Sequence, residues 1–177
     1  MICFPLCLMK KMIRLFLFLI APVFFSCNNS VKKKTGTDNV IDSFTSTLKE
    51  NKVEGELYIS LPETYSVRHK GGADFMVYYL GPADSTVVPS FSGGIYLGNF
   101  PSEFPATNDS CKTSSIKGKI LDNAPEWKIF TCDSSFFLQT IIDNKGDKSA
   151  DKLHAFGKGI VGNEEKVLKM FATLKRK

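Results

Sequence analysis

The sequence predicts an α/β (α+β) domain, in which an antiparallel sheet of about six strands is covered by an N-terminal and a C-terminal helix. Apolar residues recur at helical spacing near both ends of the domain. Between them lie short stretches rich in β-branched and aromatic residues, separated by turn-forming residues. Connections this short favour antiparallel neighbours, because a parallel pair needs a long crossover.

The first helix is expected over residues 39–50. Asp38 is placed to cap it, and Ile41, Phe44 and Leu48 fall on one stripe at spacings of three and four. This stripe would face the sheet.

The last helix is expected from Glu164 to Leu174, with Asn163 as its N-cap. Acidic residues stand at its positive end, and residues 175–177 are basic and follow its negative end. The buried stripe comprises Val167, Leu168, Phe171 and Leu174.

Seven stretches are typical of strands: residues 55–61, 74–80, 93–100, 115–121, 126–132, 135–142 and 152–160. Residues 68–74, which include His69, and residues 143–151 are predicted turns. Residues 74–80 are apolar at both parities, which is typical of a central strand covered on both faces. Helices or long loops are therefore expected over each face.

The N-terminus has the features of a secretory signal. Lys10, Lys11 and Arg14 precede an uncharged apolar run, residues 15–25. This run is shorter than the about 20 apolar residues that span a bilayer. Residues 1–26 are therefore predicted to be a signal peptide, and the protein to be exported.

The residues after this run, "SCNNS", resemble the lipobox of bacterial lipoproteins. In that family the cysteine becomes the first mature residue and carries the lipid, so the resemblance implies lipidation of Cys27, with Ser26 as the small residue before it. Phe24 and Phe25 depart from the usual pattern. The alternative is a plain signal peptide with an incidental cysteine. By analogy with the enteric sorting rule, Asn28 favours the outer membrane, facing the periplasm.

The mature chain divides into a tether, residues 27–38, and a single globular domain, residues 39–177. The net charge of the full chain is +5, and residues 1–26 carry three basic and no acidic residues, which leaves +2 for the mature chain. No basic stripe remains, so nucleic acid is not expected as a partner. The membrane is the expected partner, through the lipid anchor.

Cys111 and Cys132 are the two cysteines left in the mature chain if Cys27 is lipidated. An even pair in an oxidising compartment predicts a disulfide. Two free thiols are an alternative, and so is a metal site, although no C-x-x-C pair or nearby histidine accompanies them.

Gly157, Gly159 and Gly162 spell G-x-G-x-x-G, the pattern of a dinucleotide-binding loop. That fingerprint needs a second parallel strand and an acidic residue about 20 positions further on. The sequence provides neither, so no nucleotide and no cofactor is expected. The glycines are instead predicted to let the last strand twist and turn.

No catalytic residue and no metal ligand is assigned. His69 and His154 lie outside any recognisable nucleophile or metal motif, and His154 is expected to be a half-buried strand residue. Asp143, Asp147 and Asp151 lack the order of a calcium loop, because Lys145 stands where an oxygen ligand is required.

The long loop "GNFPSEFPATNDSC", residues 98–111, lies between two predicted strands. Loops of this length are often functional. Phe100 and Phe104 either pin the loop to the domain or face solvent beside Trp127 as an aromatic contact patch. As a hypothesis, Phe100, Phe104 and Trp127 are binding residues.

The stretches "ISLPETYSV" and "LHAFGKGIVGNEEKVLKMFATLK", with Trp127 near the start of a middle strand, resemble the PsbP-like fold of small exported lipoproteins and of some secretion-effector chaperones. The resemblance covers about residues 50–175 and implies an α/β/α sandwich without a shared catalytic site. A fold does not by itself give a function.

The sequence therefore predicts a cell-envelope lipoprotein with a non-catalytic domain that binds an envelope protein or a small ligand, or has a structural role. One alternative is a periplasmic immunity protein that neutralises a delivered toxin. The other is an envelope hydrolase, against which the absence of a nucleophile motif and the scarcity of histidine speak.

Overall fold

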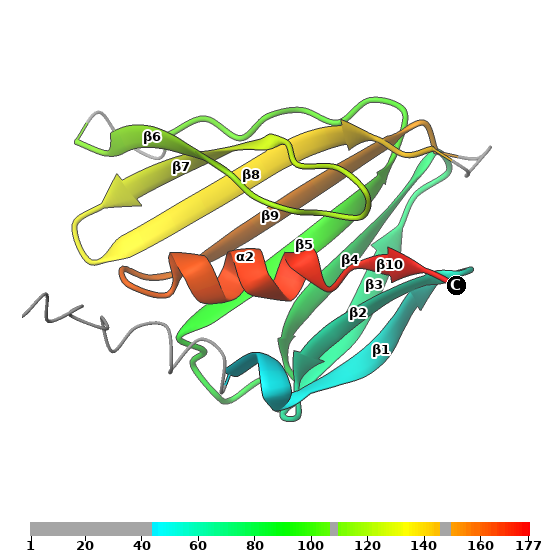
Figure 1. The fold of residues 1–177 in the computed structure, drawn as a ribbon, viewed down its shortest axis with the longest axis horizontal. Helices are drawn as coiled ribbons and strands as arrows, with labels where there is room; N and C mark the ends of the chain where they lie inside the picture. The colour runs from blue at the N-terminus through cyan, green and yellow to red at the C-terminus, as the bar shows by residue number, and fades with distance from the viewer. Residues whose placement is uncertain (1–43, 107–109, 146–149) are drawn as a thin grey trace, which may run out of the picture. The chain divides into compact units, whose positions relative to one another are not determined.

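The computed structural model describes residues 44–106, 110–145 and 150–177, all of which belong to one compact unit, Lys34–Lys177. Two antiparallel sheets, of seven and three strands, make up most of this part of the chain (Figure 1). Cys27 and the predicted signal peptide lie outside the described residues. No helix within the described ranges is long and apolar enough to cross a membrane.

The larger sheet has the strand order β3-β4-β5-β9-β8-β7-β6. Hairpins join β3 to β4, β4 to β5, β6 to β7, β7 to β8 and β8 to β9, while the 98–111 loop carries the chain from β5, next to the central strand β9, to β6 at the edge. The strands are β3 (Tyr65–Gly71), β4 (Phe75–Pro82), β5 (Phe91–Gly98), β6 (Lys112–Lys117), β7 (Glu126–Cys132), β8 (Ser135–Asp143) and β9 (Lys152–Ile160).

The smaller sheet consists of β1 (Leu48–Glu54), β2 (Leu57–Pro62) and β10 (Lys175–Arg176), with β2 in the middle. β2 alternates between fully buried and partly exposed residues, as a strand with one face on the core should. The buried residues are Leu57, Ile59 and Leu61.

The helix α2 (Glu164–Ala172) lies on the same side of the larger sheet as the smaller sheet (Figure 1). It contacts β5, β9 and β2. The expected apolar stripe of this helix is confirmed, because Val167, Leu168, Phe171 and Leu174 are all buried. The main core therefore lies between one face of the larger sheet and a layer made of α2 and the smaller sheet.

Asn163 occupies the predicted N-cap position of this helix, but its side chain does not cap the helix. The Asn163 side chain makes no capping bond and donates instead to the Ile160 carbonyl, at 3.1 Å. Residues 175 and 176 belong to β10 and pair with β2.

The first predicted helix is also not observed as such. A helical turn at residues 44–46 is followed by β1, so residues 48–50 are in a strand; residues 39–43 lie outside the described part. The apolar spacing of Phe44 and Leu48 suits a helix, but backbone pairing of β1 with β2 overrides this local preference. Phe44 still packs on the domain, with its ring 5.7 Å from that of Phe91.

The predicted α/β/α sandwich is wrong, and so is the arrangement that the resemblance to the PsbP-like fold implies. Two antiparallel sheets dominate, and among the described residues α2 is the one helix longer than a single turn. No helix of the described residues lies on the other face of the larger sheet (Figure 1). A strand that is apolar on both faces, such as residues 74–80, is predicted to be covered on both faces. In the structure, aromatic rings on the face opposite α2 pack against one another and stay partly exposed.

Most strand predictions agree with the structure, and residues 126–132 and 152–160 have the predicted bounds. Residues 68–71, which include His69, are predicted to form a turn but lie in β3. The glycine, histidine and lysine at these positions do not predict a strand, and β3 forms through its pairing with β4. Residues 118–121 were assigned to a strand but form the turn between β6 and β7.

The glycine motif is structural rather than a nucleotide loop. β9, which contains Gly157 and Gly159, pairs antiparallel with both of its neighbours, so no parallel crossover follows the motif. Gly162, with φ of 95°, makes the turn into α2.

Replacing Gly157 with alanine is expected to destabilise the domain by about 2 kcal/mol. A Cβ atom at this position would lie 2.5 Å from Cγ1 of Val167 on α2, so helix and sheet would have to separate. Thermal unfolding measures the effect. The control is Lys158→Ala, an exposed residue on the same strand β9, which should change the free energy of unfolding little. Gly55→Ala is less suitable as a control, because Gly55 has a positive φ. Equal stability of Gly157→Ala and wild type would contradict this packing.

Candidate functional site

The face of the larger sheet opposite α2, here called the outer face, carries a cluster of aromatic side chains. Successive side chains of a strand point to opposite faces of the sheet, so the residues between the core positions point to the outer face. The aromatic cluster comprises Phe75 and Tyr79 on β4, Tyr96 on β5, Phe156 on β9 and Phe137 on β8. These five rings come from four adjacent strands.

The β4 end of the aromatic cluster is open. Phe75 and Tyr79 are 44% and 43% exposed, although β4 has a neighbouring strand on each side. The Phe75 and Tyr96 rings stack with 5.7 Å between centroids and 17° between planes. The ring of Phe156 occupies the space above Gly94, where a Cβ atom would overlap it. The register thus places these rings on neighbouring strands of one face.

The other end of the cluster is covered by the 98–111 loop. Phe104 packs edge-on against Phe137 and Phe156, with centroid distances of 5.4 and 5.3 Å, and lies 5.1 Å from the ring of His154. The Gln139 side chain holds the backbone of Phe104 at both ends, because its Oε1 accepts from Phe104 N–H at 2.9 Å and its Nε2 donates to the Phe104 carbonyl at 2.8 Å.

An ion pair between Glu103 and Lys128 adds a second attachment of the loop to the sheet. Residues 103 and 104 of the loop are therefore fixed on the outer face of β7, β8 and β9, and the described part of the loop leaves Phe75 and Tyr79 of β4 partly exposed.

His154 is 2% exposed, more deeply buried than the half-buried residue expected. Its Nε2 lies 3.0 Å from Gln139 Oε1, and because an amide oxygen only accepts, Nε2 carries the proton. Burial lowers the pKa of His154 to about 4 from an ordinary value of 6.5, while the charge of Glu103 opposes the shift. The side chain is therefore neutral at pH 7 and supports Gln139 and the loop.

The free energy of unfolding should fall by about 2 kcal/mol between pH 6.5 and pH 4 because of His154, after allowance for the solvent that reaches the site. The folded-state pKa is depressed, so the unfolded chain takes up the proton first and stability is lost as the pH falls through this window. Denaturant unfolding of wild type and His154→Gln as a function of pH isolates this contribution. The same pH slope in both proteins would contradict it.

The residues proposed from sequence for binding do not form one patch. Trp127 is completely buried on the core face, where its ring lies 5.3 Å from that of Phe171. Phe104 lies on the opposite face of the sheet and is 43% exposed. Phe104 therefore pins the loop, while Phe100, which is 85% exposed, does not.

Phe75, Tyr79, Tyr96 and Phe156 are not predicted as surface residues from the sequence. Residues 74–80 are apolar at both parities, a pattern that predicts burial on both faces and that an exposed aromatic surface also produces.

Cys111 and Cys132 lie at disulfide-bonding distance, with their Cα atoms 4.3 Å apart. Cys111 precedes β6 and Cys132 ends β7, next to the pair Lys112 and Thr131 in the ladder. A bond here attaches the end of the 98–111 loop to the sheet.

Non-reducing peptide mapping should link Cys111 to Cys132. The bond closes a loop with a sequence separation of 21 and is expected to stabilise the domain by about 3 kcal/mol in the chain-entropy estimate. Replacing both cysteines with serine should therefore lower the midpoint of chemical denaturation, as should a reducing agent on the wild type alone. Free thiols at both positions in protein purified from the periplasm would contradict the bond.

The open part of the outer face is cationic. Arg68 and Lys70 on β3 and Lys158 on β9 are exposed and directed to the outer face beside the aromatic cluster. Among the described residues, no acidic residue points outward from β3, β4, β5 or β9. Lys152 is directed there too, but it pairs with Asp143 at 2.6 Å. The described charged side chains that point outward from β3, β4, β5 and β9 beside the aromatic rings are therefore all cationic.

The described residues contain no group of three or more histidine, cysteine, aspartate or glutamate side chains that could hold a metal ion. Comparison with protein-family models, with curated proteins and with solved structures finds no match for this chain.

Proposed function

We propose that this protein is an exported lipoprotein whose domain binds an acidic envelope protein on its outer face. The observation that carries this proposal is the aromatic cluster, whose rings on β4 stay partly exposed beside cationic side chains, while none of the described residues that point outward from β3, β4, β5 or β9 is acidic. Rigid aromatic residues supply large apolar contact areas at low entropic cost and are frequent anchors of protein interfaces.

The proposed location rests on the N-terminal sequence. The basic cluster, the apolar run and "SCNNS" support export and a lipid on Cys27, and Asn28 supports the outer membrane on its periplasmic side. The tether of residues 27–38 would hold the domain close to the membrane surface.

The partner is expected to present apolar groups surrounded by acidic ones. Phe75 and Tyr79 would contact its apolar groups, because their rings are the exposed end of the cluster. Arg68, Lys70 and Lys158 would speed association with an acidic surface and select against basic ones. No step of this function requires a catalytic group.

The double variant Phe75→Ser, Tyr79→Ser tests the proposal. Its affinity for a partner isolated from envelope extract should be at least about 30-fold weaker, since losing one aromatic anchor can cost about 2 kcal/mol. Its melting temperature should stay near that of wild type, because both side chains are partly exposed. Val88→Ser, which removes a side chain that is 91% exposed in the loop between β4 and β5, is the matched control. Equal binding by the double variant and the control would contradict the proposal.

A further inference from the structure

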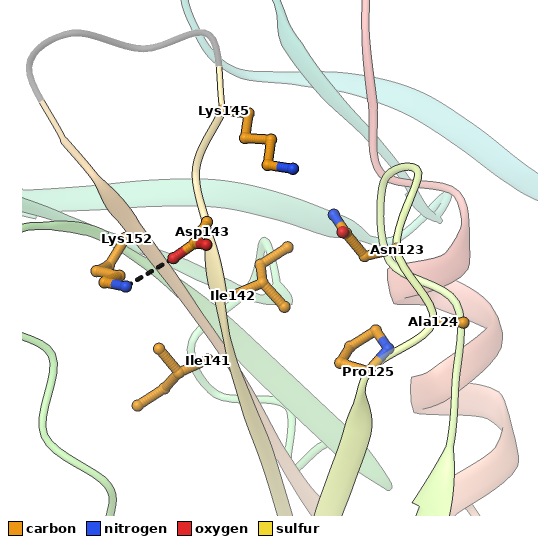
Figure 2. A pocket seen from close by; sticks show the side chains of 8 residues that line it. All are labelled: Asn123, Ala124, Pro125, Ile141, Ile142, Asp143, Lys145 and Lys152. Carbon is orange, nitrogen blue, oxygen red and sulfur yellow. Dashed lines mark hydrogen bonds and ion pairs between the residues drawn. The ribbon is translucent and has the colours of Figure 1, made fainter.

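A hollow of about 610 Å³ lies between the turn that joins β6 to β7 and the segment that runs from the end of α2 into β10. It adjoins a second cavity of about 410 Å³, with which it shares Asn123, Asp143 and Lys145 (Figure 2). Figure 2 shows Asn123 and Lys145 on the two sides of this second cavity, at the end of β8.

The hollow exists because β7 pairs with only part of β8. The ladder between them runs from Lys128 to Cys132 on β7, so residues 140–143 of β8 lack a partner strand on that side. The turn before β7 bends away instead, with backbone bonds from Gly118 N–H to the Pro125 carbonyl at 3.1 Å and between Ile120 and Asn123 at 3.0 Å in both directions.

The walls of the hollow are fixed by the core. Ile120 is completely buried at the tip of this turn, and Trp127 Nε1 donates to the Gly118 carbonyl at 3.2 Å. On the opposite wall, Thr173 Oγ1 accepts from Ser60 N–H at 2.8 Å and donates to the Met170 carbonyl at 2.6 Å. A ligand would therefore meet a preformed site with little ordering cost.

The lining of the larger hollow carries an excess of positive charge. Four cationic side chains line it, Lys119, Lys145, Lys175 and Arg176, against two acidic ones, Asp122 and Asp143. Lys175 pairs with Glu50 and Asp143 pairs with Lys152, both at 2.6 Å. The ammonium groups of Lys119 and Lys145 make no ion pair with any described residue.

Arg176 is the best-placed group for an anion. Its guanidinium donates through Nη2 to Asn144 Oδ1, which orients it, and Asn144 is itself buried and held by a bond to the Ala150 carbonyl at 2.8 Å. Arg176 Nε is buried and has no acceptor within the described part of the chain. Because Nε is shielded from solvent, a ligand in the hollow would reach the guanidinium through its Nη atoms, and a guanidinium held in one orientation suits contact with carboxylates and phosphates.

We infer that this hollow, here called the basic hollow, binds a small molecule that carries a phosphate or carboxylate group. The anion would lie between Arg176 and the two lysines, and the polar side chains of Asn123 and Thr173 would contact the rest of the ligand. This site is separate from the aromatic cluster, and the inference does not rest on the proposed function.

Calorimetric titration of the purified full-length chain in detergent tests the inference, with inorganic pyrophosphate and citrate as separate probes at constant ionic strength. The double variant Lys119→Gln, Lys145→Gln should weaken binding of the preferred probe at least about tenfold. The control Lys52→Gln, Lys112→Gln removes the same charge from exposed positions on β1 and β6 and should bind as wild type does. Circular dichroism verifies that both variants are folded.

Binding of pyrophosphate alone would assign the basic hollow to phosphates, and binding of citrate alone would assign it to carboxylates. Binding of both would support an oxyanion site without preference. Failure of wild type to bind either probe, or an equal loss of affinity in the control, would overturn the inference.

Discussion

Replacing Trp127 with alanine is expected to lower the free energy of unfolding by about 4 kcal/mol. Trp127 is completely buried, its ring packs 5.3 Å from that of Phe171 on α2, and its Nε1 donates to Gly118. The substitution removes the contact between β7 and the helix and leaves the Gly118 carbonyl without this donor. Chemical denaturation of wild type and variant gives the difference.

Ile116→Ala is the control for this experiment. Ile116 pairs with Trp127 across the ladder between β6 and β7, but it is 45% exposed, so its truncation should cost less than about 1 kcal/mol. A loss below about 1 kcal/mol for Trp127→Ala would mean that the core between the larger sheet and α2 is not packed as described.

Replacing Cys27 with serine is expected to release the protein from the membrane into the soluble periplasmic fraction. A lipid-modified cysteine would be the membrane anchor, because the apolar run before it is removed with the signal peptide. Detergent partitioning of envelope fractions measures the effect. Intact mass spectrometry should give a mature chain that begins at Cys27 and carries the mass of a lipid.

Cys132→Ser is the matched control, since it also exchanges one cysteine for serine but should leave the anchor in place. A mature chain with an unmodified Cys27, or membrane retention of Cys27→Ser, would contradict the anchor and favour a plain signal peptide.

The sequence predicted correctly those elements whose local pattern and tertiary role coincide. The helix near the C-terminus has a continuous apolar stripe, and α2 buries that stripe. Residues 126–129 alternate between exposed or partly exposed and buried positions, and β7 has the predicted bounds of 126–132. For such segments, short-range periodicity already specifies which side chains are buried.

The elements that the sequence did not predict depend on long-range contacts. β1 takes its conformation from pairing with β2, against a helical apolar spacing, and β3 is defined by its ladder with β4. The separation of Trp127 from Phe104 depends on which face of the sheet the 98–111 loop crosses, and periodicity within the loop does not encode that.

Similarly, the two apolar parities of residues 74–80 are compatible both with a covered strand and with an exposed aromatic surface. The basic hollow has no sequence motif at all, because Lys119, Lys145 and Arg176 come together through the departure of β7 from β8.

Photo-crosslinking in intact cell envelopes tests most directly whether the outer face binds a protein. A photoreactive amino acid is placed at Tyr79 in the full-length chain, and in a second protein at Val88, which is exposed outside the aromatic cluster. We predict that position 79 traps one acidic envelope protein in high yield, that position 88 does not, and that Phe75→Ser in the same chain reduces the yield. Equal labelling from both positions, or no crosslinked partner at position 79, would contradict a binding function for the aromatic cluster.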